Sequence, residues 1–176
     1  DIIDVMDKKG LYLQGHAPSV SGRMLSAYLC GGPNTCHESR ERNEALEKLR
    51  SGMYVDARES SITKNVEEIY EGVKGVKFYD HFCLCTDDRE ADDILHVGHM
   101  NDVVRTVIRS GMDPVTAIKS ATLNTAREIH IENLGAIAPG YVADMLLVGD
   151  LEELKPDLVF FGGRLVAEKG HMTVPI

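Results

Sequence analysis

Short strands alternate with amphipathic helices along the first three quarters of the chain, and only a few residues connect them. Strands are expected over residues 10–17, 33–38, 53–60 and 80–88. Helices are expected over residues 21–32, 39–52, 63–75, 93–111 and 113–130. Successive strands joined through single helices favour a parallel sheet with right-handed crossovers. The order of elements therefore predicts an α/β fold.

Two helices carry clear end signals. Ser39 is expected to cap the helix that begins there, and Gly52 to end it. Asp113 and Pro114 open the last of the helices, with proline at the first helical position, where a missing N–H is tolerated. These signals predict where the connecting loops lie.

The character of the sequence changes after residue 133. Residues 134–176 contain short apolar segments separated by glycines, and Gly162–Gly163 is typical of a hairpin turn. We therefore expect two parts: an α/β part over residues 1–133 and part of a small β module over residues 134–176.

Composition limits the partners and the compartment. A net charge of −9 argues against a nucleic-acid backbone or an anionic membrane as partner, and favours an uncharged small molecule. No apolar run reaches the roughly 18 residues of a membrane span, and the first ten residues show no signal-peptide core. The four cysteines form no C-x-x-C pair, so we expect reduced, buried cysteines in a cytoplasmic protein.

Polar side chains stand where the expected strands end. His16 ends the first strand, His37 the second, and Asp87 the fourth. The carboxyl ends of parallel strands meet at one edge of a sheet, so these groups are expected to face one mouth. Two imidazoles and a carboxylate are ligand types for zinc, manganese or iron. Each residue alone also fits a purely structural role, such as capping a helix.

The remaining histidines are not expected to bind metal. They lie inside helical stretches, at element ends or in the C-terminal β part: His81, His96, His99, His130 and His171.

Four motifs resemble adenine deaminases, which belong to the amidohydrolase superfamily. They are "GHAPSVSG", "TCHES", "MYVDARES" and "CLCTDDR", in that order and spacing, and the segment from residue 121 to 151 resembles the superfamily's exit from its barrel. The resemblance spans about residues 8 to 170. It implies half of a TIM-like (β/α)8 metal-dependent hydrolase barrel, namely the last four βα units. Part of a small β-sandwich is expected to follow the barrel. Ser19 and Ser60 stand where that family usually has glycine.

The resemblance also implies a reaction, the hydrolysis of adenine to hypoxanthine and ammonia in purine salvage, with two divalent metal ions, Mn²⁺ or Fe²⁺, and Zn²⁺ as a further option. The implied metal ligands are His16, His37 and Asp87. Catalysis is expected from Asp87, which shuttles a proton, and from Glu38, which protonates a ring nitrogen of the base. The residues expected to bind the base are Arg58, Glu59, Ser60 and Asp88.

Part of the superfamily's pattern has no counterpart here. No H-x-H pair occurs, and four strands are half of the eight that a barrel needs. We therefore expect this chain to be a fragment of a longer polypeptide, whose remainder completes the barrel. The whole protein is also expected to be a homo-oligomer.

Three other interpretations stay open. One is another amidohydrolase, such as a dihydroorotase-like cyclic amidase or an amino-sugar deacetylase. The second is the unrelated zinc-deaminase fold, whose P-C-x-x-C signature does not occur in the sequence. The third is a catalytically silent interaction domain, which would bind no metal.

Overall fold

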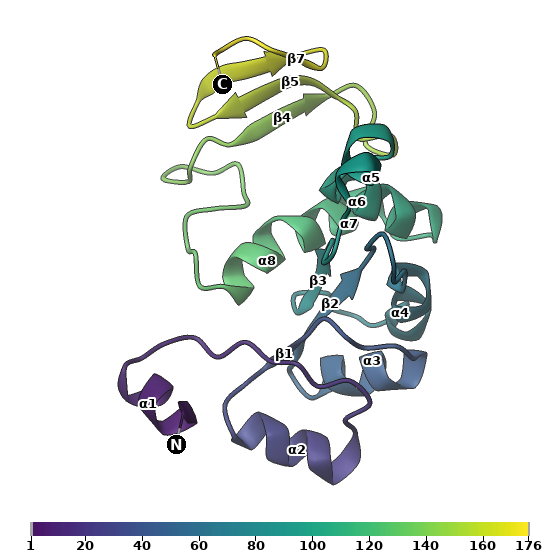
Figure 1. Ribbon diagram of the computed structural model, residues 1–176, viewed down its shortest axis with the longest axis vertical. Helices are drawn as coiled ribbons and strands as arrows, with labels where there is room; N and C mark the ends of the chain where they lie inside the picture. The colour runs from purple at the N-terminus through teal and green to yellow at the C-terminus, as the bar shows by residue number, and fades with distance from the viewer. Residues whose placement is uncertain (1, 176) are drawn as a thin grey trace.

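A computed structural model describes residues 2–175, and it confirms the α/β architecture (Figure 1). Three strands form a parallel sheet in the order β1-β2-β3. They are β1 (Thr35–Cys36), β2 (Tyr54–Arg58) and β3 (Phe82–Cys85). The expected strands over 33–38, 53–60 and 80–88 are therefore present, in shorter form.

Eight helices are present in the described residues. They are α1 (Ile2–Lys8), α2 (Gly22–Cys30), α3 (Arg42–Arg50), α4 (Val66–Val73), α5 (Ala91–His96), α6 (Met100–Arg109), α7 (Pro114–Ala121) and α8 (Leu123–Glu128). The single helix expected over 93–111 is interrupted at Gly98, whose φ of 134° no helix accommodates. Asp113 caps α7 as predicted, because its side chain accepts a hydrogen bond from the Thr116 N–H.

Alternation along β2 separates the two faces of the parallel sheet. Val55 and Ala57 point into the main core with the buried face of α4, and the core continues through Leu84 of β3. Tyr54, Asp56 and Arg58 alternate with them and therefore lie on the opposite face. This alternation places polar groups on the face away from the core.

Four further sequence predictions are wrong. The helix expected over 113–130 is divided at Thr122 into α7 and α8. The strand expected over residues 10–17 does not form in the described chain; instead, the Gly15 N–H donates to Thr35 Oγ1 and the His16 N–H to the Tyr28 hydroxyl. These side-chain oxygens take the backbone donors that a strand ladder would need. Ser39 does not cap α3, since the helix begins after Glu41 and Ser39 is buried against Lys48. Cys30 is exposed, although all four cysteines are free as expected.

The C-terminal part forms an antiparallel sheet at one end of the molecule (Figure 1). Its strands are β4 (Met145–Val148), β5 (Pro156–Phe161), β6 (Arg164–Glu168) and β7 (His171–Met172). Gly162 and Gly163 both have positive φ and turn β5 into β6, as predicted.

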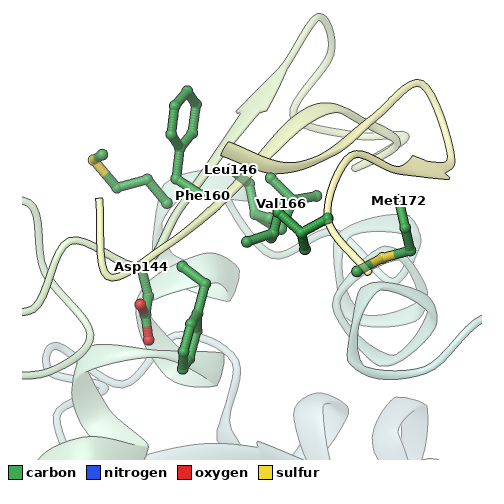
Figure 2. Close-up of a pocket in the computed structure, with 9 residues that line it drawn as sticks. Asp144, Leu146, Phe160, Val166 and Met172 are labelled. Atoms are coloured by element: carbon green, nitrogen blue, oxygen red, sulfur yellow. The ribbon is translucent and has the colours of Figure 1, made fainter. Parts of the chain in front are cut away.

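An apolar hollow of about 490 Å³ lies on this antiparallel sheet (Figure 2). Its lining includes Leu146, Phe160, Val166 and Met172. Asp144 is the one charged residue among the lining residues. The hollow therefore offers little of the polar chemistry that hydrolysis needs.

No helix in the described part of the chain is long and apolar enough to cross a membrane.

Candidate active site

The loops that follow the three parallel strands bring polar side chains together. His37 follows β1 directly, Arg58 is the last residue of β2, and Asp87 lies two residues beyond β3. Because the strands are parallel and paired in register, their carboxyl ends share one edge of the sheet. The mouth predicted from the sequence is thus formed by these three loops.

His37, Glu38 and Asp87 form a compact cluster. One side-chain nitrogen or oxygen from each residue lies within 4.8 Å of the others. His16 joins from the segment before α2, because its Nδ1 is 3.3 Å from His37 Nε2. Of the three residues proposed as metal ligands, His37 and Asp87 therefore lie in one cluster, while His16, from an irregular segment, contacts only His37 of its members and lies outside that cluster.

The guanidinium of Arg58 bridges the two carboxylates of the cluster. The same nitrogen, Nη1, donates to Glu38 Oε1 and to Asp87 Oδ2. Burial acts to raise the pKa of Asp87, but the hydrogen bond and charge of Arg58 outweigh it and hold that pKa below its usual range. Asp87 is therefore a carboxylate, able to accept a proton, at neutral pH.

The backbone also orients Asp87. Its φ of 53° is in the left-handed region, which aspartate tolerates better than most residues. Its Oδ1 accepts a hydrogen bond of 2.8 Å from the Asp88 N–H.

Ser19, in the loop after His16, has a φ of 60°, which is in the left-handed region that favours glycine. This explains why glycine is usual at that position in the family that the sequence resembles.

The donor set fits a divalent metal ion. Two nitrogens bound to one ion at about 2.0–2.1 Å, with tetrahedral geometry, lie about 3.3 Å apart. That is the separation of His16 Nδ1 and His37 Nε2. A carboxylate, Asp87, lies beside His37 as a third ligand type.

Of the four residues predicted to bind the base, only Arg58 has a side-chain hydrogen bond to this cluster in the described chain. Glu59 and Ser60 are buried, and the Ser60 hydroxyl bonds to Thr63 within its own loop. Arg58 is engaged with the two carboxylates, and Asp88 is exposed. None of these four lines the cavity described next, so their role in binding stays a prediction.

A cavity of about 290 Å³ opens beside the cluster. His37 and Asp87 line it together with four polar residues that the sequence analysis missed: Gln14, Asp56, Thr125 and Glu128. Alternation with Arg58 along β2 was the signal that could have identified Asp56. No local pattern connects Glu128, at the end of α8, to this edge of the sheet.

Asp56, Glu128 and Cys83 form a second, buried cluster, with one ligand-type atom of each within 4.8 Å of the others. Burial, and then the charge of Glu128, raise the pKa of Asp56 well above its usual range. Burial also raises the pKa of Glu128, and it raises that of the Cys83 thiol. The two carboxyls are close enough for the protonation of one to affect the pKa of the other.

The other histidines stay outside both clusters in the described chain. His81 stacks on Tyr54 with ring centroids 4.2 Å apart, and His130 contacts the Tyr12 ring at 4.5 Å. His96 lies beside Asp92 on the surface of α5. That these histidines bind no metal stays a prediction.

A parallel sheet with imidazoles and carboxylates gathered at the carboxyl ends of its strands defines a class of α/β proteins that bind divalent metals there. The chain belongs to the Amidohydrolase family, whose sequence model matches residues 1–166. Membership in this superfamily implies a divalent metal, in agreement with the donor set.

Relatives confirm the resemblance drawn from the motifs. An adenine deaminase from Kosmotoga olearia is 40% identical over 174 residues, which are 99% of this chain and 30% of that protein. An adenine deaminase from Dehalococcoides mccartyi is 45% identical over 171 residues, 95% of this chain and 30% of that protein. The chain spans about 30% of the length of these curated relatives.

Solved structures share the fold at low identity. A beta-aspartyl dipeptidase from Fervidobacterium islandicum AW-1 superposes with a TM-score of 0.67 at 22% identity, over 93% of this chain and 49% of that one. An enamidase of the amidohydrolase superfamily superposes with a TM-score of 0.66 at 16% identity, over 95% of this chain and 50% of that one. At these identities the likeness shows the fold alone.

Proposed function

We propose that the protein containing this chain hydrolyses adenine to hypoxanthine and ammonia. The observation that carries the proposal is the cluster of His37, Glu38 and Asp87, whose reactive atoms lie within 4.8 Å of one another. The 40–45% identity to adenine deaminases over nearly the whole chain favours adenine over the substrates of other amidohydrolases.

We further propose that residues 1–133 are the last four βα units of a (β/α)8 barrel, and that residues 134–176 belong to a small β-sandwich. The segment ending at His16 takes the place of the first of these strands. Residues beyond this sequence would complete the barrel and supply further ligands, since the chain spans about 30% of its relatives. Residues 1–176 alone are therefore expected to release no ammonia from adenine.

Asp87 and Glu38 divide the proton transfers between them. Asp87 accepts a proton from the attacking water as the new C6–O bond forms, and passes it to the departing amine as the C6–N bond breaks. Glu38 delivers a proton to a ring nitrogen, which makes C6 electrophilic, and recovers one from the new hydroxyl as the C6 carbonyl forms. Arg58 keeps the two carboxyl groups adjacent.

His16, His37 and Asp87 would hold the divalent metal. When bound, such an ion supplies Lewis acidity that lowers the pKa of a water molecule. For the whole protein we propose two metal ions per site, Mn²⁺ or Fe²⁺. We also propose that it is a cytoplasmic homo-oligomer. Arg58, Glu59, Ser60 and Asp88 are proposed to bind the base.

Glu38→Gln in the full-length protein tests the proton transfer. The substitution keeps the shape of the side chain and removes its acid, so kcat should fall about 10²- to 10⁴-fold. Metal content should not change, because the proposed ligands stay in place. The matched control is Glu41→Gln, an exposed residue of the same loop whose side chain makes no capping bond. A Glu38→Gln enzyme with near wild-type turnover contradicts the role.

Metal analysis and substrate assays separate the alternatives. An adenine deaminase contains metal and releases ammonia from adenine. A cyclic amidase contains metal, leaves adenine intact and opens a dihydropyrimidine ring. A silent interaction domain contains no stoichiometric metal and does neither.

A further inference from the structure

A lysine is completely buried behind the cluster. Lys48, on α3, has 0% of its surface exposed, and lysines are almost never fully buried unless they are paired. Its partner is Glu44, one helical turn earlier, whose Oε1 lies 2.5 Å from Lys48 Nζ. Apolar side chains at these positions would avoid the desolvation of two charges. The pair therefore calls for an explanation other than stability.

The contacts of Lys48 lie next to the proposed site residues. Its Nζ donates to the Ala17 carbonyl at 2.5 Å and to Ser39 Oγ at 3.1 Å, and it lies 3.3 Å from Cys36 Sγ. Ala17 follows His16, while Cys36 and Ser39 flank the pair formed by His37 and Glu38. One ammonium group thus joins both histidine-bearing segments.

Glu44 repeats the same connection through backbone N–H groups. Its Oε1 accepts from the Ser19 N–H at 2.7 Å, and its Oε2 accepts from the Arg40 N–H at 3.1 Å. Ser19 belongs to the loop after His16, and Arg40 to the loop after Glu38. Burial acts against the charged form of Glu44, but Lys48 and these two N–H groups outweigh it and lower the pKa of this carboxyl.

These links matter because the His16 segment has no strand ladder. Residues 11–16 lie outside every strand of the described chain, so backbone pairing with β1 does not fix the position of His16. The 3.3 Å separation of the two imidazole nitrogens depends on side-chain links instead.

We propose that Glu44 and Lys48 are positioning residues, which hold the loop of His16 against the loop of His37 and Glu38 at metal-binding separation. The inference rests on the proposed function, because it assumes that these imidazoles bind metal. The pair touches neither substrate nor metal and acts through the backbone of the two loops.

The test compares the buried ion pair of α3 with an exposed ion pair that joins α3 to α4, in the full-length protein. Lys48→Met with Glu44→Gln replaces the buried pair by neutral side chains of similar size. Arg42→Met with Glu68→Gln is the control, because it replaces the exposed pair of Arg42 on α3 with Glu68 on α4, whose charged atoms lie 2.9 Å apart, in the same way. Circular dichroism establishes that each variant is folded.

The Lys48→Met, Glu44→Gln variant, called the pair variant, should bind Mn²⁺ about 10- to 100-fold more weakly in a direct titration. This is the usual loss of metal affinity when a group that orients the metal ligands is removed. Its kcat on adenine should fall, with KM changed less than kcat, and the absorption spectrum of its Co²⁺ form should shift. The control should match the parent in all three measurements. A folded pair variant with parental Mn²⁺ affinity overturns the inference.

Ser39→Ala keeps the inference testable if the pair variant does not fold. It removes one Lys48 contact and leaves the ion pair intact, so the Mn²⁺ affinity should fall severalfold. Unchanged affinity would then overturn the inference. Failure of the proposed function has a different signature, since the parent protein would bind Mn²⁺ without releasing ammonia from adenine.

Discussion

Gly15 lies beside the proposed site in a position with no room for a side chain. It precedes His16, and a Cβ added there would lie 2.5 Å from the Thr35 carbonyl oxygen, 2.5 Å from the Tyr28 hydroxyl and 3.3 Å from Pro33 Cβ. Its φ is not in the left-handed region, so Gly15→Ala is opposed by space alone. The substitution therefore probes how closely the His16 segment must approach β1.

The size of the displacement follows from these contacts. Ordinary contact for a Cβ begins at 3.4 Å, so the shortfall against Thr35 is 3.4 − 2.5 = 0.9 Å. Tyr28 can swing aside, but the Thr35 carbonyl belongs to β1 and cannot move without breaking the pairing with β2. The His16 segment must take up most of the shift.

Two effects of different size are expected from Gly15→Ala. Overpacking of this kind lowers the free energy of unfolding by about 1–3 kcal/mol. A misplacement of about 1 Å can lower turnover about a hundredfold. Weaker metal binding should accompany the loss of turnover, because His16 is a proposed ligand.

Three measurements on the full-length protein check this expectation: urea unfolding, Mn²⁺ titration and ammonia release from adenine. Gly149→Ala is the control, since its nearest atom, Asp157 Oδ2, would be 3.6 Å from the new Cβ and its φ is not left-handed. Parental metal affinity and turnover in Gly15→Ala would refute the reasoning that the close approach positions His16.

Two further predictions concern stability. The folded pKa of Asp56 lies above its unfolded value of about 3.9, so the folded chain holds more protons and the free energy of unfolding falls as pH rises through that window. Asp56→Asn should flatten this dependence and raise stability at pH 8 relative to the parent; equal slopes in urea unfolding at pH 5 and pH 8 would count against it. Asp113→Ala removes the cap bond of 2.9 Å to Thr116 and should cost about 1 kcal/mol of unfolding free energy, while Asp113→Asn should cost much less.

The sequence predicted the elements whose burial is local and regular. In β3, Phe82, Cys83 and Leu84 are buried, and the four apolar positions of α4 share one buried face, so a simple apolar pattern sufficed. The segment 10–17 also contains a short apolar run, Leu11, Tyr12 and Leu13, but it forms no ladder. Thr35 Oγ1 and the Tyr28 hydroxyl accept its N–H groups, and such tertiary partners are invisible in a local pattern.

The site was predicted in outline for a similar reason. His37, Glu38 and Asp87 follow strands in the sequence, and parallel strands carry such residues to one edge. The buried carboxyl pair of Asp56 and Glu128 was missed, because one partner lies inside a strand and the other at the end of a distant helix. Only the packing of α8 on β3 brings them together.

The loops at this edge are held mainly by buried side chains. Asn65 accepts from the Arg58 N–H at 2.9 Å and donates to the Ser39 carbonyl at 2.7 Å, so it ties the β2 loop to the β1 loop.

Arg89 continues the series, because its Nη1 donates to the Glu59 carbonyl at 2.8 Å and joins the β3 loop to the β2 loop. With Lys48 between the loops of His16 and His37, each loop is linked to the next by one buried or half-buried polar side chain. The site residues that follow the two-residue strand β1 are therefore held by side-chain hydrogen bonds to backbone atoms in addition to a short ladder.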